Sequence, residues 1–455
     1  MRTILTLLAA VLGAPLAPFA QAPTGPEGSS FESWNWEPIA TDYSNIRGLN
    51  YVPHWAGSSV GIWRYYDGDQ VESDLGYFKG IGCNAVRIWL SEAVYRVEGA
   101  DFLDKLEDFL ERCERHRLYV MPILWDAVGN QPSANPYDDD QDWVKNPATP
   151  DAKDPNYWLT YGDPYVAAVV GVVKDSRALL MWDLMNEPGP LPFLQHYAQY
   201  VDLLAPTNKQ TIGWAAAHSN VSTAHWPEID VISYHPYGAF KDNIELWTER
   251  AREFSLANGG KPILASEFGS PGILQRYEDA LEHIQAEGVG FLLWQAMIGP
   301  PPHFLWYQDG FFYQDGEVRD TEGVLAFQQA SIRQGYEGPL APVVEKPPGD
   351  PLYLPMYPVP LGFGGPELVP ALATWLDRPP LMPQNVPFVE TISTWASISI
   401  AWLEILTPAD VAEVQSYIDG FNDAVAAGDF VEADMWLDLW GMFNWFFVEQ
   451  EGYSG

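Results

Sequence analysis

The chain has 455 residues, of which 47% are hydrophobic and 14% aromatic, and its formal net charge is −37 with only 24 basic side chains. The apolar content is that of a globular protein and excludes a largely disordered chain. The acidic balance excludes nucleic acid and anionic membrane surfaces as partners, because both would be repelled. At this length we expect one large domain with an extension.

The first residues have the pattern of an export signal. Arg2 is followed by an apolar stretch over residues 4–20, and Ala20-Gln21-Ala22 fits a small-x-small cleavage site. We therefore expect a signal peptide over residues 1–22 and a secreted or periplasmic protein. A single membrane anchor is the alternative, which Pro15 and Pro18 disfavour. No later segment offers the run of about 18 apolar residues that a membrane span needs.

Apolar runs of strand length alternate with amphipathic helical patterns from about residue 45 to residue 335. The clearest predicted helices are Asp101–His116, Asn243–Ala257 and Ile273–Ala286. Eight alternations predict an α/β fold of the (β/α)₈ TIM-barrel type. A doubly wound open sheet is the alternative, and it is disfavoured because no Gly-rich phosphate-binding turn follows an early predicted strand. The predicted strands are Ile46–Val52, Ala85–Leu90, Tyr119–Trp125, Ala178–Leu184, Thr211–Trp214, Val231–Tyr234, Ile263–Ser266 and Gly290–Trp294.

The segment after the third predicted strand, residues 127–163, is long and rich in Asp, Asn, Pro and Tyr. Loops of this length are usually functional or disordered. Its acidic run lacks the fixed ligand spacing of a Ca²⁺ loop, so we expect a solvated loop with no metal. Its aromatic residues are expected on the substrate side of the barrel. The acidic residues are Asp138, Asp139, Asp140 and Asp142, and the aromatic ones are Tyr137, Trp143, Tyr157 and Trp158.

Two cysteines, Cys83 and Cys113, fit either a disulfide or a pair of buried thiols, and neither has a catalytic pattern. A single glycosylation sequon at Asn220-Val221-Ser222 carries little information.

Beyond the barrel, proline becomes dense. Residues 339–387 read as a Pro-rich connector, and residues 388–455 as a small helical extension. The last predicted helix carries Trp436, Trp440, Phe443 and Phe447 at helical spacing, which favours the core of a helical hairpin over a binding face. The expected organisation is a signal peptide, a catalytic domain over 23–338, this connector and the extension.

Polar side chains follow the carboxyl ends of the predicted strands, where barrel enzymes assemble their sites. Strand-end carboxylates are costly to desolvate unless they are paired or used, and glycoside hydrolysis needs two of them. One must keep its proton, and the other must stay ionised, which donors from arginine and tyrosine favour. An asparagine can bind the sugar 2-hydroxyl, and an indole can pack on the sugar ring. The residues are Arg87, Asn186, Glu187, His235, Tyr237, Glu267 and Trp294.

Residues 45–335 resemble a clan A glycoside hydrolase, most closely glycoside hydrolase family 5, the cellulase and mannanase family. The resemblance implies a retaining mechanism with Glu187 as acid/base and Glu267 as nucleophile. It implies that Arg87 and Tyr237 orient Glu267, that His235 lies beside Glu187, that Asn186 binds the 2-hydroxyl and that Trp294 is the floor of subsite −1. The motifs that carry it are Gly48-Leu49-Asn50-Tyr51, Asn84-Ala85-Val86-Arg87, Trp182-Asp183-Leu184-Met185-Asn186-Glu187-Pro188, Ser233-Tyr234-His235-Pro236-Tyr237, Ser266-Glu267-Phe268-Gly269 and Leu293-Trp294.

The end of the third strand departs from many family 5 cellulases, which carry a histidine where this chain has Trp125-Asp126. Mannanase-like members of the family often lack this histidine, so the departure points away from a cellulase without establishing mannan as the substrate. Trp125 is predicted to contact substrate. Residues 74–87 also resemble the barrel domains of β-mannosidases and β-galactosidases, so an exo-acting enzyme is an alternative. We expect a secreted enzyme that cleaves a neutral β-linked polysaccharide or oligosaccharide without a cofactor. A catalytically silent carbohydrate-binding barrel is the alternative from another class.

Overall fold

The computed structural model describes residues 36–141, 143–215, 222–237, 241–270, 275–298 and 309–343, and the single positions 416, 420, 423, 424 and 427. The predicted signal peptide lies outside the described residues, as do the connector beyond residue 343 and all but those single positions of the helical extension. Asp142 and the first two sequon residues also lie outside them. The domain boundaries stay predictions.

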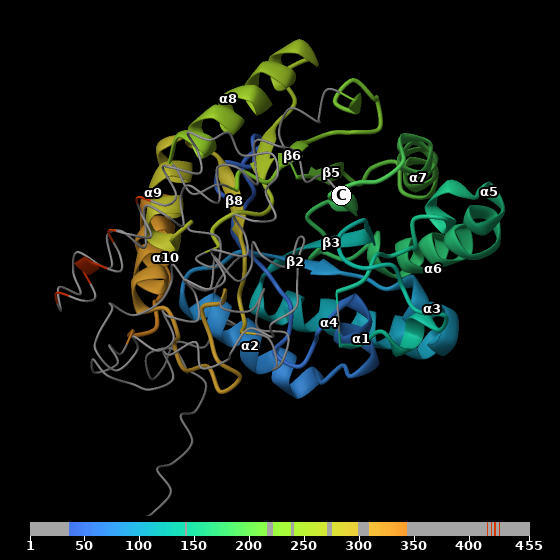
Figure 1. The fold of residues 1–455 in the computed structure, drawn as a ribbon, viewed down its shortest axis with the longest axis horizontal. Helices are drawn as coiled ribbons and strands as arrows, with labels where there is room; N and C mark the ends of the chain where they lie inside the picture. Colours follow the sequence, from blue (N-terminus) through green and yellow to red (C-terminus); the bar gives the residue numbers. More distant parts are fainter. Residues whose placement is uncertain are drawn as a thin grey trace, which may run out of the picture.

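Eight parallel strands form a closed barrel in chain order, with β1 hydrogen-bonded to both β2 and β8. The prediction of a (β/α)₈ barrel is confirmed, and the open-sheet alternative is excluded because the first and last strands pair. The strands lie at the centre of the molecule, with helices around them (Figure 1). They are β1 Arg47–Asn50, β2 Ala85–Trp89, β3 Tyr119–Asp126, β4 Trp182–Asn186, β5 Gln210–Trp214, β6 Ile232–Tyr234, β7 Ile263–Ala265 and β8 Gly290–Leu293.

The fourth strand begins later than its apolar run predicts. Ala178, Leu180 and Met181 are buried and Leu179 is partly buried. These residues meet β3 around Val120, through a bridge with Leu179 and through backbone bonds from Val120 N to Ala178 O and from Leu180 N to Val120 O. Pairing with β5 starts at Trp182, opposite Gln210. Burial alone therefore extended the predicted strand toward its amino end.

The helices pack around the barrel and bury one face each. In α4 the buried side chains are those of Phe102, Leu106, Phe109, Leu110 and Cys113, the stripe expected of an amphipathic helix. The described part of the β5–β6 connection contains no α-helix. The helices are α1 Ser59–Arg64, α2 Gly68–Gly80, α3 Glu92–Glu98, α4 Ala100–His116, α5 Pro155–Tyr157, α6 Asp163–Val173, α7 Leu191–Leu204, α8 Lys241–Ala257, α9 Tyr277–Ala286 and α10 Thr321–Arg333.

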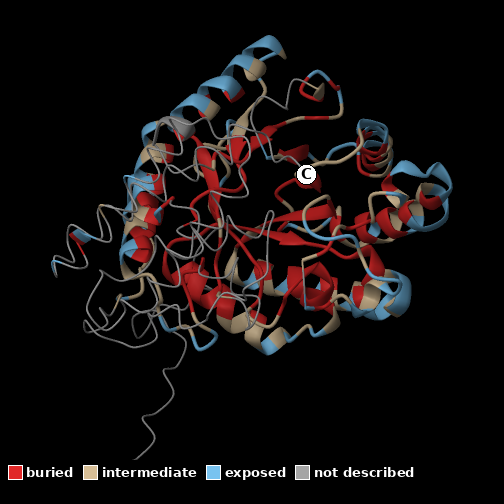
Figure 2. Ribbon diagram, viewed as in Figure 1, coloured by how far each residue is buried: buried red, intermediate tan, exposed pale blue. Residues whose placement is uncertain are grey.

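The apolar core has two parts, and buried residues follow the strands while exposed residues lie on the outer faces of the helices (Figure 2). A large cluster fills the space between strands and helices. A smaller cluster, which includes Ala85, Met121, Leu264 and Leu292, fills the amino-terminal end of the barrel. The carboxyl end is filled by polar side chains instead, so the barrel presents its chemistry at that end.

A register shift on β4 determines which of its side chains reach the barrel interior. Asp183 pairs with Thr211, and Asn186 with Gly213, so three steps on β4 match two steps on β5. Strict alternation would place Asp183 and Asn186 on opposite faces of the strand. The extra residue brings both to the interior, where both contact Arg87.

The loop over residues 127–163 contains the 3₁₀ turns Pro136–Asp138 and Asp151–Lys153, the helix α5 and the π-helical turn Trp158–Gly162. Its described aspartates bind the protein itself. Asp140 accepts hydrogen bonds from Arg64, and Asp139 accepts one from the Ser133 backbone. These contacts engage the two carboxylates within the protein, and that the loop holds no metal stays a prediction.

The two cysteines are buried as free thiols. Of the two alternatives left open by the sequence, the structure has the unpaired one. Burial raises the pKa of Cys83 to about 12, which keeps this thiol protonated. Within the described residues, no helix combines the length and the apolar character required to cross a membrane.

Candidate active site

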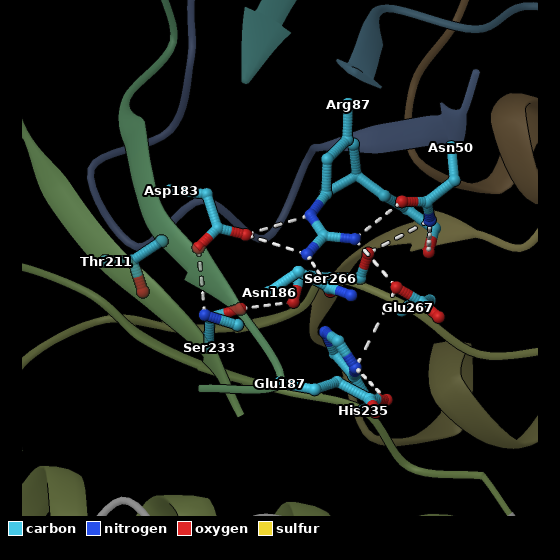
Figure 3. Close-up of polar contacts among 12 residues, drawn as sticks. Asn50, Arg87, Asp183, Asn186, Glu187, Thr211, Ser233, His235, Ser266 and Glu267 are labelled. Atoms are coloured by element: carbon cyan, nitrogen blue, oxygen red, sulfur yellow. Dashed lines mark hydrogen bonds and ion pairs between the residues drawn. The ribbon is translucent and has the colours of Figure 1, made fainter. Parts of the chain in front are cut away.

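The centre of the site is the buried guanidinium of Arg87, which extends from β2 into the carboxyl end of the barrel (Figure 3). Its Nε and Nη2 donate to Asp183 Oδ2 at 3.0 and 2.8 Å. Nη1 donates to Asn50 Oδ1 and to Glu267 Oε2, both at 2.8 Å, and Nη2 also donates to Asn186 Oδ1 at 2.6 Å. A fixed fork of donors therefore holds four side chains, from the ends of three other strands, in one arrangement.

Glu267 follows β7 and accepts a hydrogen bond on each carboxyl oxygen. Arg87 Nη1 donates to Oε2, and Tyr237 Oη donates to Oε1 at 2.9 Å. The side chain is only 9% exposed. Two donors, one of them cationic, stabilise negative charge on this carboxyl group. The predicted orienting contacts of Arg87 and Tyr237 are present in the structure.

Glu187 follows β4 and differs from Glu267 in its surroundings. Burial raises the pKa of Glu187 to about 7, against the opposing influence of Arg87. Its side chain is 29% exposed, so it can meet a ligand. Its φ of +42° is rare for a non-glycine residue, and its backbone N–H donates to Gly213 O at 2.7 Å. Strained backbone of this kind concentrates at functional sites.

His235 lies between the two glutamates, after β6 (Figure 3). Its Nδ1 is 3.2 Å from Glu187 Oε1 and 3.8 Å from Glu267 Oε2. Burial lowers the pKa of His235 to about 4, so the imidazole is neutral at neutral pH. When both glutamates are ionised, the neutral ring carries its proton on Nδ1, because only carboxyl oxygens face that atom.

The two carboxyl groups and the imidazole converge. One ligand-capable atom from each of Glu187, His235 and Glu267 lies within 4.8 Å of the others. One carboxyl with a raised pKa and one held by two donors form a pair with different chemistry. A histidine and two carboxylates are also ligand types for a divalent cation. That the site uses no metal stays a prediction.

A wall of tryptophans borders this cluster. The Trp294 ring lies 5.6 Å from Trp89 and 6.4 Å from Trp143, both near perpendicular. Trp89 is buried beneath the guanidinium of Arg87, whereas Trp143 and Trp294 are partly exposed. A partly exposed indole on this side of the barrel can pack against a sugar ring.

The predicted substrate contact of Trp125 needs correction. Its side chain is 1% exposed and packs against Tyr165, Phe193 and Tyr197 of the surrounding helices. Trp125 pairs with Met185, and Asp126 pairs with Asn186, so β3 follows the register shift of β4. This pairing turns Trp125 outward and Asp126 inward.

Asp126 is a site residue that the sequence reasoning missed. It is 1% exposed and accepts hydrogen bonds from Asn186 Nδ2 at 3.1 Å and from Trp143 Nε1 at 2.8 Å. Burial raises the pKa of Asp126 to about 8, although its donors act in the opposite direction. Its place directly after Trp125 on a strand end was the available signal.

Replacing Gly213 by alanine should damage the site. A Cβ there would lie 2.8 Å from both Arg87 Nη2 and Asp183 Oδ2, and 3.2 Å from His235 Nε2. These atoms are buried, so relief requires the ion pair to move, at about 1–3 kcal/mol. Thermal unfolding measures the cost. The control is Gly171→Ala, where a Cβ meets nothing within 4 Å on α6. Equal melting temperatures for the two variants would contradict the tight packing at Gly213.

No protein-family model matches the chain, and no curated protein matches its sequence. Similar solved structures include an exo-β-1,4-mannosidase from Opitutaceae bacterium strain TAV5, at 18% identity and TM-score 0.49 over 63% of this chain and 59% of that one. An endo-β-1,4-mannanase from Thermotoga petrophila matches at 14% identity and TM-score 0.48 over 64% and 77%. A glycoside hydrolase family 5 mannosidase from Rhizomucor miehei matches at 14% identity and TM-score 0.47 over 64% and 92%. The first match spans less than two thirds of that mannosidase. At this identity we infer function from the side chains and not from these similarities.

Proposed function

We propose that the chain is a retaining β-glycoside hydrolase of the family 5 type, with Glu187 as acid/base and Glu267 as nucleophile. The observation that carries the proposal is the asymmetric carboxyl pair, with an oxygen of each within 4.8 Å of the other. Retaining glycosidases place their carboxyl groups about 5–5.5 Å apart, and inverting ones about 6.5–9.5 Å apart to admit a water molecule. The close spacing favours direct attack by Glu267.

In the first step, a carboxylate oxygen of Glu267 attacks the anomeric carbon and the glycosidic bond breaks. Glu187 transfers its proton to the departing oxygen, and the sugar becomes an ester of Glu267. Arg87 and Tyr237 hold Glu267 in its attacking position, because each donates to a different oxygen. Asn186, held by Arg87, can bind the 2-hydroxyl.

In the second step, ionised Glu187 removes a proton from a water molecule. The water oxygen attacks the anomeric carbon, Glu267 leaves as a carboxylate, and Glu187 is again protonated. Neutral His235 stabilises the ionised form of Glu187 by donating from Nδ1. Because the histidine stays uncharged, it leaves the proton of Glu187 available in the first step.

The proposed substrate is a neutral β-linked glycan of the β-mannan or β-glucan type. The net charge of −37 disfavours polyanions. Exo action on mannosides or galactosides is the alternative. The test is product release from β-mannan, cellulose, xylan, laminarin and aryl β-glycosides. Internal cleavage with falling viscosity supports endo action, and release of monosaccharide alone supports the exo alternative. Export from the cytoplasm stays a prediction from the first 22 residues.

The pH dependence of kcat/KM should report the proton on Glu187. The first step needs the protonated form, whose pKa in the free enzyme is about 7. Activity should therefore fall as the pH rises through about 7, by about tenfold per pH unit above it. Initial rates on an aryl β-glycoside between pH 5 and pH 9 measure this.

The matched variant is Glu187→Gln, which cannot donate a proton. It should lose about 10²–10⁴-fold on substrates with poor leaving groups and should show no alkaline decline of its own. Azide should restore turnover of an aryl glycoside with a good leaving group, as a β-glycosyl azide. An unchanged alkaline limb in this variant would assign the proton to another group. Glycan binding without turnover by the unaltered chain across the whole panel would support the silent barrel instead.

A further inference from the structure

We propose that Asp126 is a positioning residue that fixes Asn186 and the loop residue Trp143 together, and that Trp143 is a sugar contact beside Trp294. This inference rests on the proposed function and deepens it, because it makes the loop over residues 127–163 part of substrate recognition. Trp143 would then contribute to substrate specificity, although its loop lies outside the catalytic motifs in the sequence. The substrate class it concerns is a neutral pyranoside with an apolar ring face.

The first support is a continuous set of hydrogen bonds. Trp143 Nε1 donates to Asp126 Oδ2 at 2.8 Å, and Asn186 Nδ2 donates to Asp126 Oδ1 at 3.1 Å. Arg87 Nη2 donates to Asn186 Oδ1 at 2.6 Å, and Arg87 Nη1 donates to Glu267. The indole of a loop residue is thus connected to the proposed nucleophile through three intervening side chains.

The second support is the chemistry of Asp126 itself. Its Oδ1 also accepts from Val128 N at 2.9 Å, so the carboxyl group has three partners and all are donors. Asparagine has the same shape but one acceptor oxygen, and its NH₂ group would face the indole N–H. The arrangement therefore requires two acceptor oxygens at this position, which aspartate has and asparagine lacks.

The third support is the way the backbone seats Trp143. Asp126 and Asn146 exchange backbone hydrogen bonds at 2.7 and 2.8 Å, and Trp143 O accepts from Asn130 N at 3.0 Å. Gly129, at φ +96°, lets the chain approach, since a Cβ there would lie 2.4 Å from Trp143 O. Trp143 is therefore held both through its backbone and through its ring nitrogen, as a preformed contact surface requires.

The fourth support is the position of the ring. Trp143 lies edge-on to buried Trp89 at 5.3 Å and to Trp294 at 6.4 Å. Trp143 and Trp294 keep part of their surface exposed, and Trp294 is the proposed floor of the sugar subsite. A sugar that packs on Trp294 would therefore also meet the exposed part of Trp143.

The test compares kcat and KM for four variants on the best substrate of the panel. Asp126→Asn should lower kcat/KM about 100-fold, since small misplacements of a catalytic group have effects of that size. Trp143→Phe, which keeps a ring but loses the N–H, should lose about tenfold, mainly in kcat. The double variant should be no worse than Asp126→Asn alone, because both changes break one network. Trp143→Ala, which removes the ring as well as the N–H, should show the same loss in kcat and in addition raise KM about tenfold.

The matched controls are Asp74→Asn and Trp158→Phe. Asp74 is a buried aspartate that accepts from Tyr51 and Gln70, and Trp158 is a tryptophan of the same loop whose N–H binds backbone oxygens. Neither contacts the site, so both should keep kcat and KM within about twofold of the unaltered chain. Losses in Asp126→Asn no larger than in Asp74→Asn would overturn the positioning role. A multiplicative loss of about 1000-fold in the double variant would overturn the coupling.

A second readout does not need catalysis. The indole ¹⁵N–¹H resonance of Trp143, assigned from its absence in Trp143→Phe, should move in both Asp126→Asn and Asn186→Ala. It should stay in place in Asp74→Asn. A resonance indifferent to both site variants overturns the network. A chain that hydrolyses nothing overturns the proposed function, and the resonance still decides whether Asp126 couples the two side chains.

Discussion

Replacement of Glu267 by alanine should reduce kcat/KM by about 10⁵-fold or more, the largest effect expected of any single substitution. Glu187 cannot take over as nucleophile, because its hydrogen-bond partner is the neutral His235, whereas Arg87 donates to Glu267 and holds it ionised. Added azide should restore turnover of an activated β-glycoside and yield the α-glycosyl azide. Steady-state rates with and without azide measure both parts.

The matched control for this variant is Glu92→Ala, which removes a buried glutamate whose side chain binds Tyr157 and Arg96 and neither of the catalytic glutamates. It should lower stability more than catalysis. A 2-deoxy-2-fluoroglycosyl fluoride should label the unaltered protein on the peptide that contains Glu267. Label on a different carboxylate, or azide rescue in Glu187→Ala that gives the α-azide, would reverse the roles assigned to the two glutamates.

Replacement of Arg87 by methionine should have the largest effect on stability. It leaves Asp183, whose side chain is fully buried, without its cation, and removes donors from Glu267 and Asn186. Breaking a buried ion pair on one side costs about 3–5 kcal/mol, which corresponds to a fall of about 10 °C in melting temperature for a domain of this size. Activity should fall at least about 100-fold, because Glu267 loses its cationic partner.

The controls for Arg87→Met distinguish the loss of the buried Arg87–Asp183 ion pair from the loss of any arginine. Arg115→Met removes an arginine that is 50% exposed and binds Glu72 on the surface, which should cost less than about 1 kcal/mol. The double variant Arg87→Met/Asp183→Asn should be more stable than Arg87→Met alone, since it removes the unpaired charge. Equal melting temperatures for Arg87→Met and Arg115→Met would contradict the role of the pair in the barrel.

The barrel could be predicted because parallel strands buried on both faces form short continuous apolar runs. Seven of these runs begin within a residue of the strands observed. The fourth was predicted early, since three of the four residues 178–181 are buried, yet the segment does not form a continuous ladder. An apolar run predicts that a segment is buried, but it does not predict hydrogen bonding to a neighbouring strand, which depends on that strand.

The candidate site could be predicted in part, because the carboxyl ends of strands meet at one end of a barrel. Arg87, Asn186, Glu187, His235, Tyr237 and Glu267 do converge there. The error at Trp125 arose from the register shift, which depends on how β4 meets β5 and leaves no local pattern. Asp126 was missed because its partner Trp143 lies 17 residues further along, in a loop.

The stereochemistry of hydrolysis tests the central claim most directly. The unaltered protein is given its best aryl β-glycoside in D₂O, and ¹H NMR follows the anomeric signals from the first turnovers. A nucleophilic Glu267 requires two displacements, so the first sugar released should be the β-anomer, with the α-anomer growing later by mutarotation. If the α-anomer is formed first, water attacks the sugar directly, and the roles assigned to Glu187 and Glu267 are contradicted.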